Sequence, residues 1–349
     1  MLQNKKSRLF LIVVMVAIII KLSLFAFVAF YAPQGKMLSD SYGYLNLSDR
    51  LAQGWVFTAQ SGSGYEIFRT PGYPLFLAIF HGLIRISLDG IVLIQIAMTL
   101  LVAFITYKVA QMVAPGIAFL SAIIILYDPP ITIYSLAILS EALFLLLIAL
   151  FMLSFVLYLK HKKIGYIVLS AFILAVAAYV RPVAYYLGFI ISFFTLYANR
   201  RENLWKSLKD ALIFLAVMYF IIGLWETRNY IFFHDFVFCR SDKYNLDKVG
   251  LFKSYARNMD PYTKGMAPLP YYINVTFRSL TSLMTRPGNF KYFKFTPLTI
   301  GGLIIGYPWM VFWLSGFIMG AIRSGRNIYI QFMLFVTLYF IFASVVGQM

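Results

Sequence analysis

Long apolar runs alternate with short polar connections along most of the chain. A transmembrane α-helix needs about 20 predominantly apolar residues, and these runs lack the period-2 alternation of membrane β-strands. The pattern therefore predicts an all-α fold, a polytopic transmembrane helical bundle with about nine spans in one membrane domain over residues 1–349. The expected spans are 9–31, 91–113, 115–129, 131–159, 164–180, 183–198, 211–226, 299–322 and 327–347.

Residues 40–53 predict a short amphipathic helix that does not cross the membrane. Tyr44, Leu47 and Leu51 fall on one apolar stripe of such a helix. Ser39 or Asp40 is placed to cap its start, and Gly54 to end it.

The run 71–86 is too short and too polar for a span, because it has about 16 residues and carries His81 and Arg85. Thr70 followed by Pro71 is a typical helix start. We interpret this run as a second amphipathic helix, lying on the membrane surface.

The positive charges decide on which side this helix lies. If 71–86 does not cross, three later clusters lie on the same side as Lys5, Lys6 and Arg8, as the positive-inside rule requires. If it crosses, all three move outside. We therefore expect an inner N-terminus and outer loops at 32–90 and about 227–298. The clusters are Lys160, Lys162 and Lys163, then Arg200, Arg201, Lys206 and Lys209, then Arg323 and Arg326.

Composition narrows the class of protein further. A chain that is 61% hydrophobic cannot be a soluble globule. Its formal net charge of +17 suits anionic lipid headgroups or an anionic substrate rather than nucleic acid, because no soluble basic domain is visible. The single Cys239 permits no intramolecular disulfide.

The stretch LSDSYGYLNLSDRLAQGWVF, residues 38–57, places two carboxylates just after the first apolar run. At about 100° per residue, Asp49 is rotated by about 900° from Asp40, so the two lie on opposite faces of one helix and cannot act as a pair. Taken alone, Asp40 is better explained as a helix cap than as a catalytic group. Asp49 is explained as part of a solvated face.

Several short motifs occur together in this chain. They are Asp40 and Tyr44 with Leu51-Ala52 and Gly54, then Arg69-Thr-Pro-Gly-Tyr73-Pro, Leu139-Ser140-Glu141, Tyr179-Val-Arg181-Pro182, and Trp225-Glu-Thr-Arg228-Asn229-Tyr230. Their order and spacing resemble the GT-C membrane glycosyltransferases, in the branch of protein O-mannosyltransferases and lipid A aminoarabinose transferases. The resemblance covers about residues 38–235.

The resemblance implies a site and a chemistry. Asp40 would be the catalytic base or would lie beside the attacking hydroxyl, and the donor would be a polyprenyl-phosphate sugar transferred with inversion. Phe68 and Arg69 stand where some relatives carry a Glu-Lys pair, and Glu66 is the only nearby acid. A divalent metal is thus conceivable but unsupported. Family chains are usually longer, so a missing C-terminal part remains open.

Departure of a lipid phosphate calls for a clamp of permanently charged, planar donors, which favours arginine over lysine. Arg69, Arg181 and Arg228 all lie at expected outer helix ends, where an interfacial arginine reaching for headgroups is the equal alternative. Arg181 is the best candidate, because Pro182 breaks the helix and fixes the corner.

Two charged residues, Lys21 and Glu141, fall inside expected spans, with Glu141 roughly 15 Å deep. Such residues are functional candidates, or they pair with each other. Five residues are thus candidates for substrate binding or structural support: Tyr44, Tyr73, Glu66, Glu141 and Lys21. We predict no metal site, because the three histidines lack ligand spacing.

The sequence therefore predicts an integral membrane glycosyltransferase of a bacterial or archaeal plasma (inner) membrane, with its active site facing outward. Its expected partners are a polyprenyl-phosphate sugar donor, a glycan, lipid or protein acceptor, and membrane lipids, but no nucleic acid. The main alternative is a polytopic transporter or lipid-carrier flippase, although we find no related halves. A noncatalytic protein that binds a lipid carrier is the third possibility.

Overall fold

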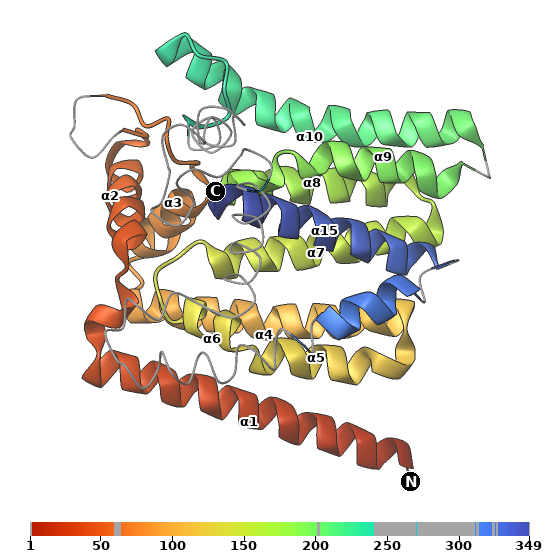
Figure 1. Ribbon diagram of the computed structural model, residues 1–349. Helices are drawn as coiled ribbons and strands as arrows, with labels where there is room; N and C mark the ends of the chain where they lie inside the picture. Colours follow the sequence, from red (N-terminus) through yellow and green to blue (C-terminus); the bar gives the residue numbers. More distant parts are fainter. Residues whose placement is uncertain are drawn as a thin grey trace. The chain divides into compact units, whose positions relative to one another are not determined.

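The computed structural model describes residues 2–58, 64–200, 203–240, 314–322 and 327–348, with positions 270, 311 and 325 (Figure 1). Within these ranges the chain is α-helical and contains no strand beyond an isolated antiparallel bridge between Thr58 and Tyr65. The all-α prediction is confirmed.

Five helices of the described residues are long and apolar enough to cross a membrane, and a bent pair of helices adds a sixth. The helices involved are α1 (Leu2–Tyr31), α4 (Leu88–Val113), α7 (Glu141–His161), α9 (Leu187–Asn199) with the 3₁₀ turn Pro182–Ala184 before it, α10 (Leu204–Phe233), and the bent pair α5 (Ala118–Tyr127) and α6 (Pro129–Ser135). Two shorter apolar helices are α8 (Ile164–Val180) and α15 (Ile328–Gln348). The expected span 299–322 lies largely outside the described residues, so the number nine stays a prediction.

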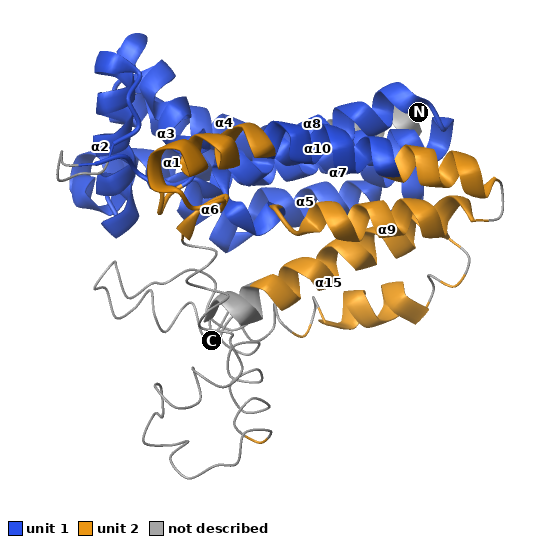
Figure 2. Cartoon of the chain, turned by 90° about the horizontal axis from the view of Figure 1, so that it is seen from above, with its two compact units in different colours: residues 1–66, 70–184, 212–222 blue, residues 67–69, 185–211, 223–349 orange. Residues whose placement is uncertain are grey.

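The chain divides into two compact units (Figure 2). Unit 1 comprises residues 1–66, 70–184 and 212–222, and unit 2 comprises residues 67–69, 185–211 and 223–349. The single membrane domain stays a prediction. In unit 2, α9 packs against α15, where the Phe194 ring lies 5.6 Å from that of Phe332.

In unit 1, α4 packs against α5 and α7, and α7 packs against α8. Helix α8 buries small side chains such as Ala171, Ala175 and Ala178, each at 0% exposure. Small residues let two membrane helices approach closely, because lipid supplies no hydrophobic force between them. A hydrogen bond of 2.9 Å from Ser170 Oγ to Ser154 Oγ joins α8 to α7.

The predicted helix of residues 40–53 is α2 (Ser39–Gly54), and it buries Leu47 and Leu51 as its periodicity indicates. The predicted N-cap is wrong. The N-cap residue is Leu38, whose backbone N–H donates to Ser41 Oγ at 3.0 Å, so Ser39 and Asp40 lie inside the first turn. The helix ends at Gly54, as expected.

The predicted surface helix of residues 71–86 begins at Gly72. It consists of α3 (Gly72–Leu77) and a π-helical turn (Ala78–Leu83), and both pack against α2. Twelve helical residues span roughly 18 Å, well short of the roughly 30 Å hydrocarbon core, so this element cannot cross the membrane.

The expected span 131–159 is wrong as one continuous helix, although the predicted break before it lies within two residues of the observed break at Asp128. Asp128 accepts a hydrogen bond of 2.9 Å from the Ile131 N–H, and Pro129 fits the first turn, so a new helix starts there. That helix, α6, is bent by 47° from the helices before it and ends at Ser135. A turn over residues 136–140 then leads into α7, which places Glu141 at a helix start rather than deep in a span.

Helix α10 continues to Phe233, so the start of the expected outer loop 227–298 is helical instead. Most of the rest of that loop lies outside the described residues.

Candidate active site

Arg181 stands where α8 ends. Val180 is the last helical residue, and Arg181 takes an extended conformation with φ −142° while its N–H donates to the Ala177 carbonyl at 2.9 Å. A residue before proline is disfavoured in the α region, so Pro182 stops the helix at this point. The predicted corner is confirmed.

The segment that opens α3 lies directly against this corner. A Cβ atom on Gly72 would meet the carbonyl carbon and oxygen of Tyr179 at 2.6 Å, so only glycine permits the observed approach. Thr70 Oγ1 donates to the Val180 carbonyl at 3.4 Å. The two sequence motifs, more than one hundred residues apart, are therefore neighbours and hold Arg181 in place.

Arg181 forms an ion pair with Glu141, the first residue of α7, with 2.7 Å between Nη1 and Oε1. The Phe144 ring, one turn further on, lies 5.9 Å from the guanidinium carbon. Burial lowers the pKa of Arg181, but the Glu141 carboxylate and the Tyr44 hydroxyl raise it, and the net shift is upward. The two side chains keep 40% and 32% of their surface exposed, so a ligand can reach the pair.

Tyr44 joins α2 to this pair. Its ring makes an edge contact with the Tyr73 ring at 5.0 Å, and its hydroxyl is hydrogen-bonded to the Ser140 side chain. Burial raises the pKa of Tyr44, while the Ser140 hydrogen bond and Arg181 only partly oppose the shift. Burial likewise raises the pKa of Tyr73, reinforced by the Glu141 carboxylate. Both tyrosines therefore enter the site as neutral hydroxyl groups.

Asp40 is exposed in the first turn of α2, one helical turn before Tyr44, and its carboxylate acts electrostatically on the Tyr44 hydroxyl. Asp49 is exposed too, but on the opposite face of the same helix. Unit 1 thus brings together five of the predicted site residues: Asp40, Tyr44, Tyr73, Glu141 and Arg181.

The expected pair of Lys21 and Glu141 is wrong. Lys21 is 1% exposed and donates a hydrogen bond of 2.8 Å to Thr132 Oγ1 on α6, while the carboxylate of Asp128 attracts it. Glu141 follows the turn after α6 and meets Arg181 instead. Lys21 therefore belongs to the packing of α1 on α6.

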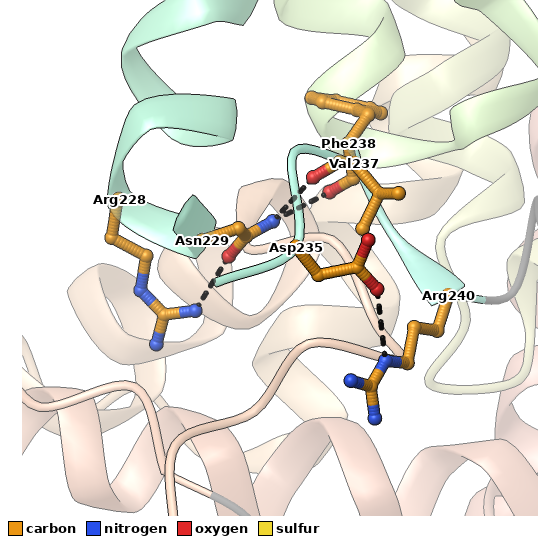
Figure 3. Close-up of polar contacts among 6 residues, drawn as sticks. All are labelled: Arg228, Asn229, Asp235, Val237, Phe238 and Arg240. Carbon is orange, nitrogen blue, oxygen red and sulfur yellow. Dashed lines mark hydrogen bonds and ion pairs between the residues drawn. The ribbon is translucent and has the colours of Figure 1, made fainter. Parts of the chain in front are cut away.

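Arg228 lies in unit 2, inside α10 rather than at its end (Figure 3). Its guanidinium carbon is 4.7 Å from the centre of the Trp225 ring, and its Nη1 donates to Asn229 Oδ1 at 2.8 Å. Asn229 Nδ2 in turn donates to the carbonyls of Val237 and Phe238 at 2.9 and 3.0 Å, which holds the chain after α10 in a tight return.

Arg69 and Glu66 are the remaining predicted site residues. Arg69 is half-buried in unit 2 just before Thr70, and Glu66, in unit 1, donates its backbone N–H to the Phe57 carbonyl at 3.0 Å. The phosphate clamp of Arg69, Arg181 and Arg228 stays a prediction. Among the described residues, no group of three or more His, Cys, Asp or Glu side chains is arranged to hold a metal ion.

Three polar residues to which the sequence assigned no role make specific contacts in the fold. Ser140 contacts Tyr44, and Gln95 of α4 is fully buried beside Tyr73. In unit 2, Tyr185 donates to Glu226 Oε1 at 3.0 Å. The available signal for Gln95 was its position as a polar amide inside the apolar run 91–113.

Comparison with known families agrees with the resemblance seen in the sequence. Residues 69–225 match the model of the dolichyl-phosphate-mannose-protein mannosyltransferase family. No curated protein matches the chain. The matched segment contains Tyr73, Glu141 and Arg181, whereas Asp40, Tyr44 and Arg228 lie outside it. Together with the apolar helices, the match supports a membrane glycosyltransferase of the mannosyltransferase-like type, and it confirms the resemblance to GT-C enzymes.

Proposed function

We propose that this glycosyltransferase takes a sugar from a polyprenyl-phosphate donor and transfers it to a hydroxyl group of an acceptor at the outer face of the membrane. The ion pair of Arg181 and Glu141 beside Tyr44 carries the proposal, because both charged residues lie within the matched segment and Arg181 supplies a fixed, accessible cation. A cation of this kind suits a phosphate leaving group.

In the proposed reaction the acceptor oxygen attacks the anomeric carbon from the side opposite the phosphate. The bond between the anomeric carbon and the phosphate oxygen breaks, and its electron pair stays on the phosphate. Asp40 receives the hydroxyl proton. The products are an inverted glycoside and a polyprenyl phosphate, so atoms and charge balance.

Arg181 would bind the phosphate as its negative charge develops. Glu141 engages one N–H of the guanidinium, and a planar guanidinium has further N–H donors for two phosphate oxygens. Glu141 would thereby fix the plane of the fork before the donor arrives. Such preorganisation favours the transition state, because no reorientation is needed during bond cleavage.

Tyr44 would complete the site as a neutral hydrogen-bonding group between Asp40 and Arg181. Its raised pKa keeps its proton in place near neutral pH, so it can contact a sugar or acceptor hydroxyl without adding charge. The positive-inside rule supports the outer location, because it places residues 32–90 on the opposite side of the membrane from the lysine and arginine clusters.

The test compares Asp40→Asn with Asp49→Asn. Loss of the base should lower turnover by about 10²- to 10⁴-fold. Asp40 is not the N-cap, and loss of its first-turn interaction with the helix dipole costs about 0.3–1 kcal/mol. Asp49→Asn removes the same charge from the same helix on the opposite face and should leave turnover nearly unchanged.

Both variants should be assayed in purified membranes with a synthetic polyprenyl-phosphate mannose and an extract of native acceptors, at matched protein levels. Normal transfer by Asp40→Asn would refute its role as the base. Failure of the wild-type chain to transfer sugar from any polyprenyl-phosphate donor would refute the donor class.

A further inference from the structure

Gln95 lies in the apolar helix α4 with 0% of its surface exposed. A polar amide in a membrane-spanning helix is costly unless its hydrogen bonds are satisfied, and such residues are retained mainly for function. Gln95 has no place in the proposed reaction. Its contacts therefore call for a separate explanation.

The amide of Gln95 makes three hydrogen bonds to groups outside α4. Its Oε1 accepts from the Tyr73 hydroxyl at 2.7 Å, and its Nε2 donates to the carbonyls of Ser135 and Ala137 at 3.1 and 2.6 Å. Both hydrogens of the amide nitrogen are thus used. Ser135 is the last residue of α6, where a helix leaves carbonyls without intrahelical partners, and Ala137 lies in the turn that follows.

These bonds tie down the short turn that leads to Glu141. Within the turn, the Ile138 N–H donates to the Lys36 carbonyl at 2.9 Å, and Ser140 contacts Tyr44. Glu141 follows immediately as the first residue of α7. Release of the two carbonyls from Gln95 would therefore free the backbone four to six residues before Glu141, whose carboxylate orients Arg181.

The third hydrogen bond, from the Tyr73 hydroxyl, connects Gln95 to the segment that packs against the Arg181 corner. Tyr73 follows Gly72, which touches the backbone of Tyr179 two residues before Arg181. One buried amide therefore connects the segment that carries Glu141 with the segment that supports Arg181.

We propose that Gln95 is a positioning residue, which sets the separation of Glu141 and Arg181 by holding the turn 136–140 against Tyr73. The catalytic consequence rests on the proposed function, but the structural consequence does not. The two can be measured separately.

The structural experiment uses a cysteine at position 139, which lies in the turn and is 6% exposed in the native chain. In a Cys239→Ser background, Leu139→Cys should react slowly with a membrane-permeant maleimide. Adding Gln95→Met, which keeps the side-chain length but removes the hydrogen bonds, should raise the labelling rate by about tenfold or more. An unchanged rate would overturn the proposal.

Two controls separate local release from general loosening. Thr99→Val removes a buried hydroxyl one turn further along α4 that bonds only to the Ile96 carbonyl of its own helix, so it should not change labelling. A reporter at the buried position Ala171 should stay protected when Gln95→Met is present. Faster labelling with Thr99→Val or at position 171 would indicate general destabilisation and overturn the proposal.

Tyr73→Phe offers a milder version of the experiment, because it removes one of the three bonds and leaves the carbonyl contacts. If Gln95→Met fails to accumulate in membranes, this variant decides the question. Faster labelling at position 139 supports the proposal, and an unchanged rate overturns it.

The catalytic experiment is a double-mutant cycle with Glu141→Gln. Gln95→Met alone should lower turnover by about 10- to 100-fold, as expected for a misplaced catalytic group. In the Glu141→Gln background it should cost little more, because the group that it positions is already gone. Independent losses that multiply would overturn the positioning role. If Glu141→Gln itself left transfer normal, the proposed function of the ion pair would fail, and the labelling result for Gln95 would still stand.

Discussion

Gly72 is the tightest point between the two segments that support Arg181, so Gly72→Ala is a sharp test of the site. The new Cβ would lie 2.6 Å from the carbonyl carbon and oxygen of Tyr179 and 2.7 Å from the Val180 nitrogen. These atoms belong to the last turn of α8 and cannot rotate aside as a side chain would. To restore an ordinary contact of 3.4 Å, the two backbones must separate by roughly 0.8 Å.

This separation has two measurable consequences. Overpacking of this kind costs about 1–3 kcal/mol of stability. A displacement near 1 Å at a catalytic group costs about 10²-fold in rate, so turnover should fall by this order. Affinity for the acceptor should change less, because the displaced group is the proposed phosphate clamp rather than an acceptor contact.

Gly165→Ala is the matched control. Gly165 lies in the first turn of α8, the helix that Gly72 contacts, and a Cβ atom on Gly165 would meet no atom within 4 Å. Alanine should be tolerated or slightly stabilising at this position, because glycine costs about 0.5–1 kcal/mol in a helix.

The assay measures thermal inactivation in detergent by size-exclusion recovery, and the initial rate of transfer from a synthetic polyprenyl-phosphate sugar. If Gly72→Ala matched Gly165→Ala in both measurements, the close approach of α3 to α8 and its role in holding Arg181 would be refuted.

Two further predictions concern the clamp and the topology. Arg181→Lys keeps the positive charge but loses the planar guanidinium that pairs with Glu141 and would bind phosphate, so the rate of transfer should fall markedly at a normal protein level. Wild-type turnover in this variant would show that Arg181 is only an interfacial anchor. In a Cys239→Ser background, a cysteine at the exposed position Asp49 should react with an impermeant thiol reagent added outside the cell, whereas one at the exposed position Lys163 should not. The reverse pattern would show that the loops are assigned to the wrong sides.

Local features of the chain were predictable because their causes are local. An apolar run must form a helix in lipid, since every backbone group has to find its partner within the segment. The amphipathic stripe of α2 needs only a period of 3.6 residues, and the corner at Arg181 needs only the proline that follows it. The end of α6 at Ser135 was missed because the stretch 131–159 contains no proline or glycine that would mark a break.

The sequence by itself determined that this is a helical membrane protein, with an acidic surface helix in its first loop and glycosyltransferase motifs in order. Only the tertiary structure decided which charges meet. Lys21 and Glu141 looked like partners as charged residues in apolar runs, yet Lys21 contacts Thr132 and Glu141 contacts Arg181. Apolar helix faces look alike to lipid, so the choice of neighbours depends on small-residue contacts and buried hydrogen bonds such as those of Gly72 and Gln95, which no local pattern specifies.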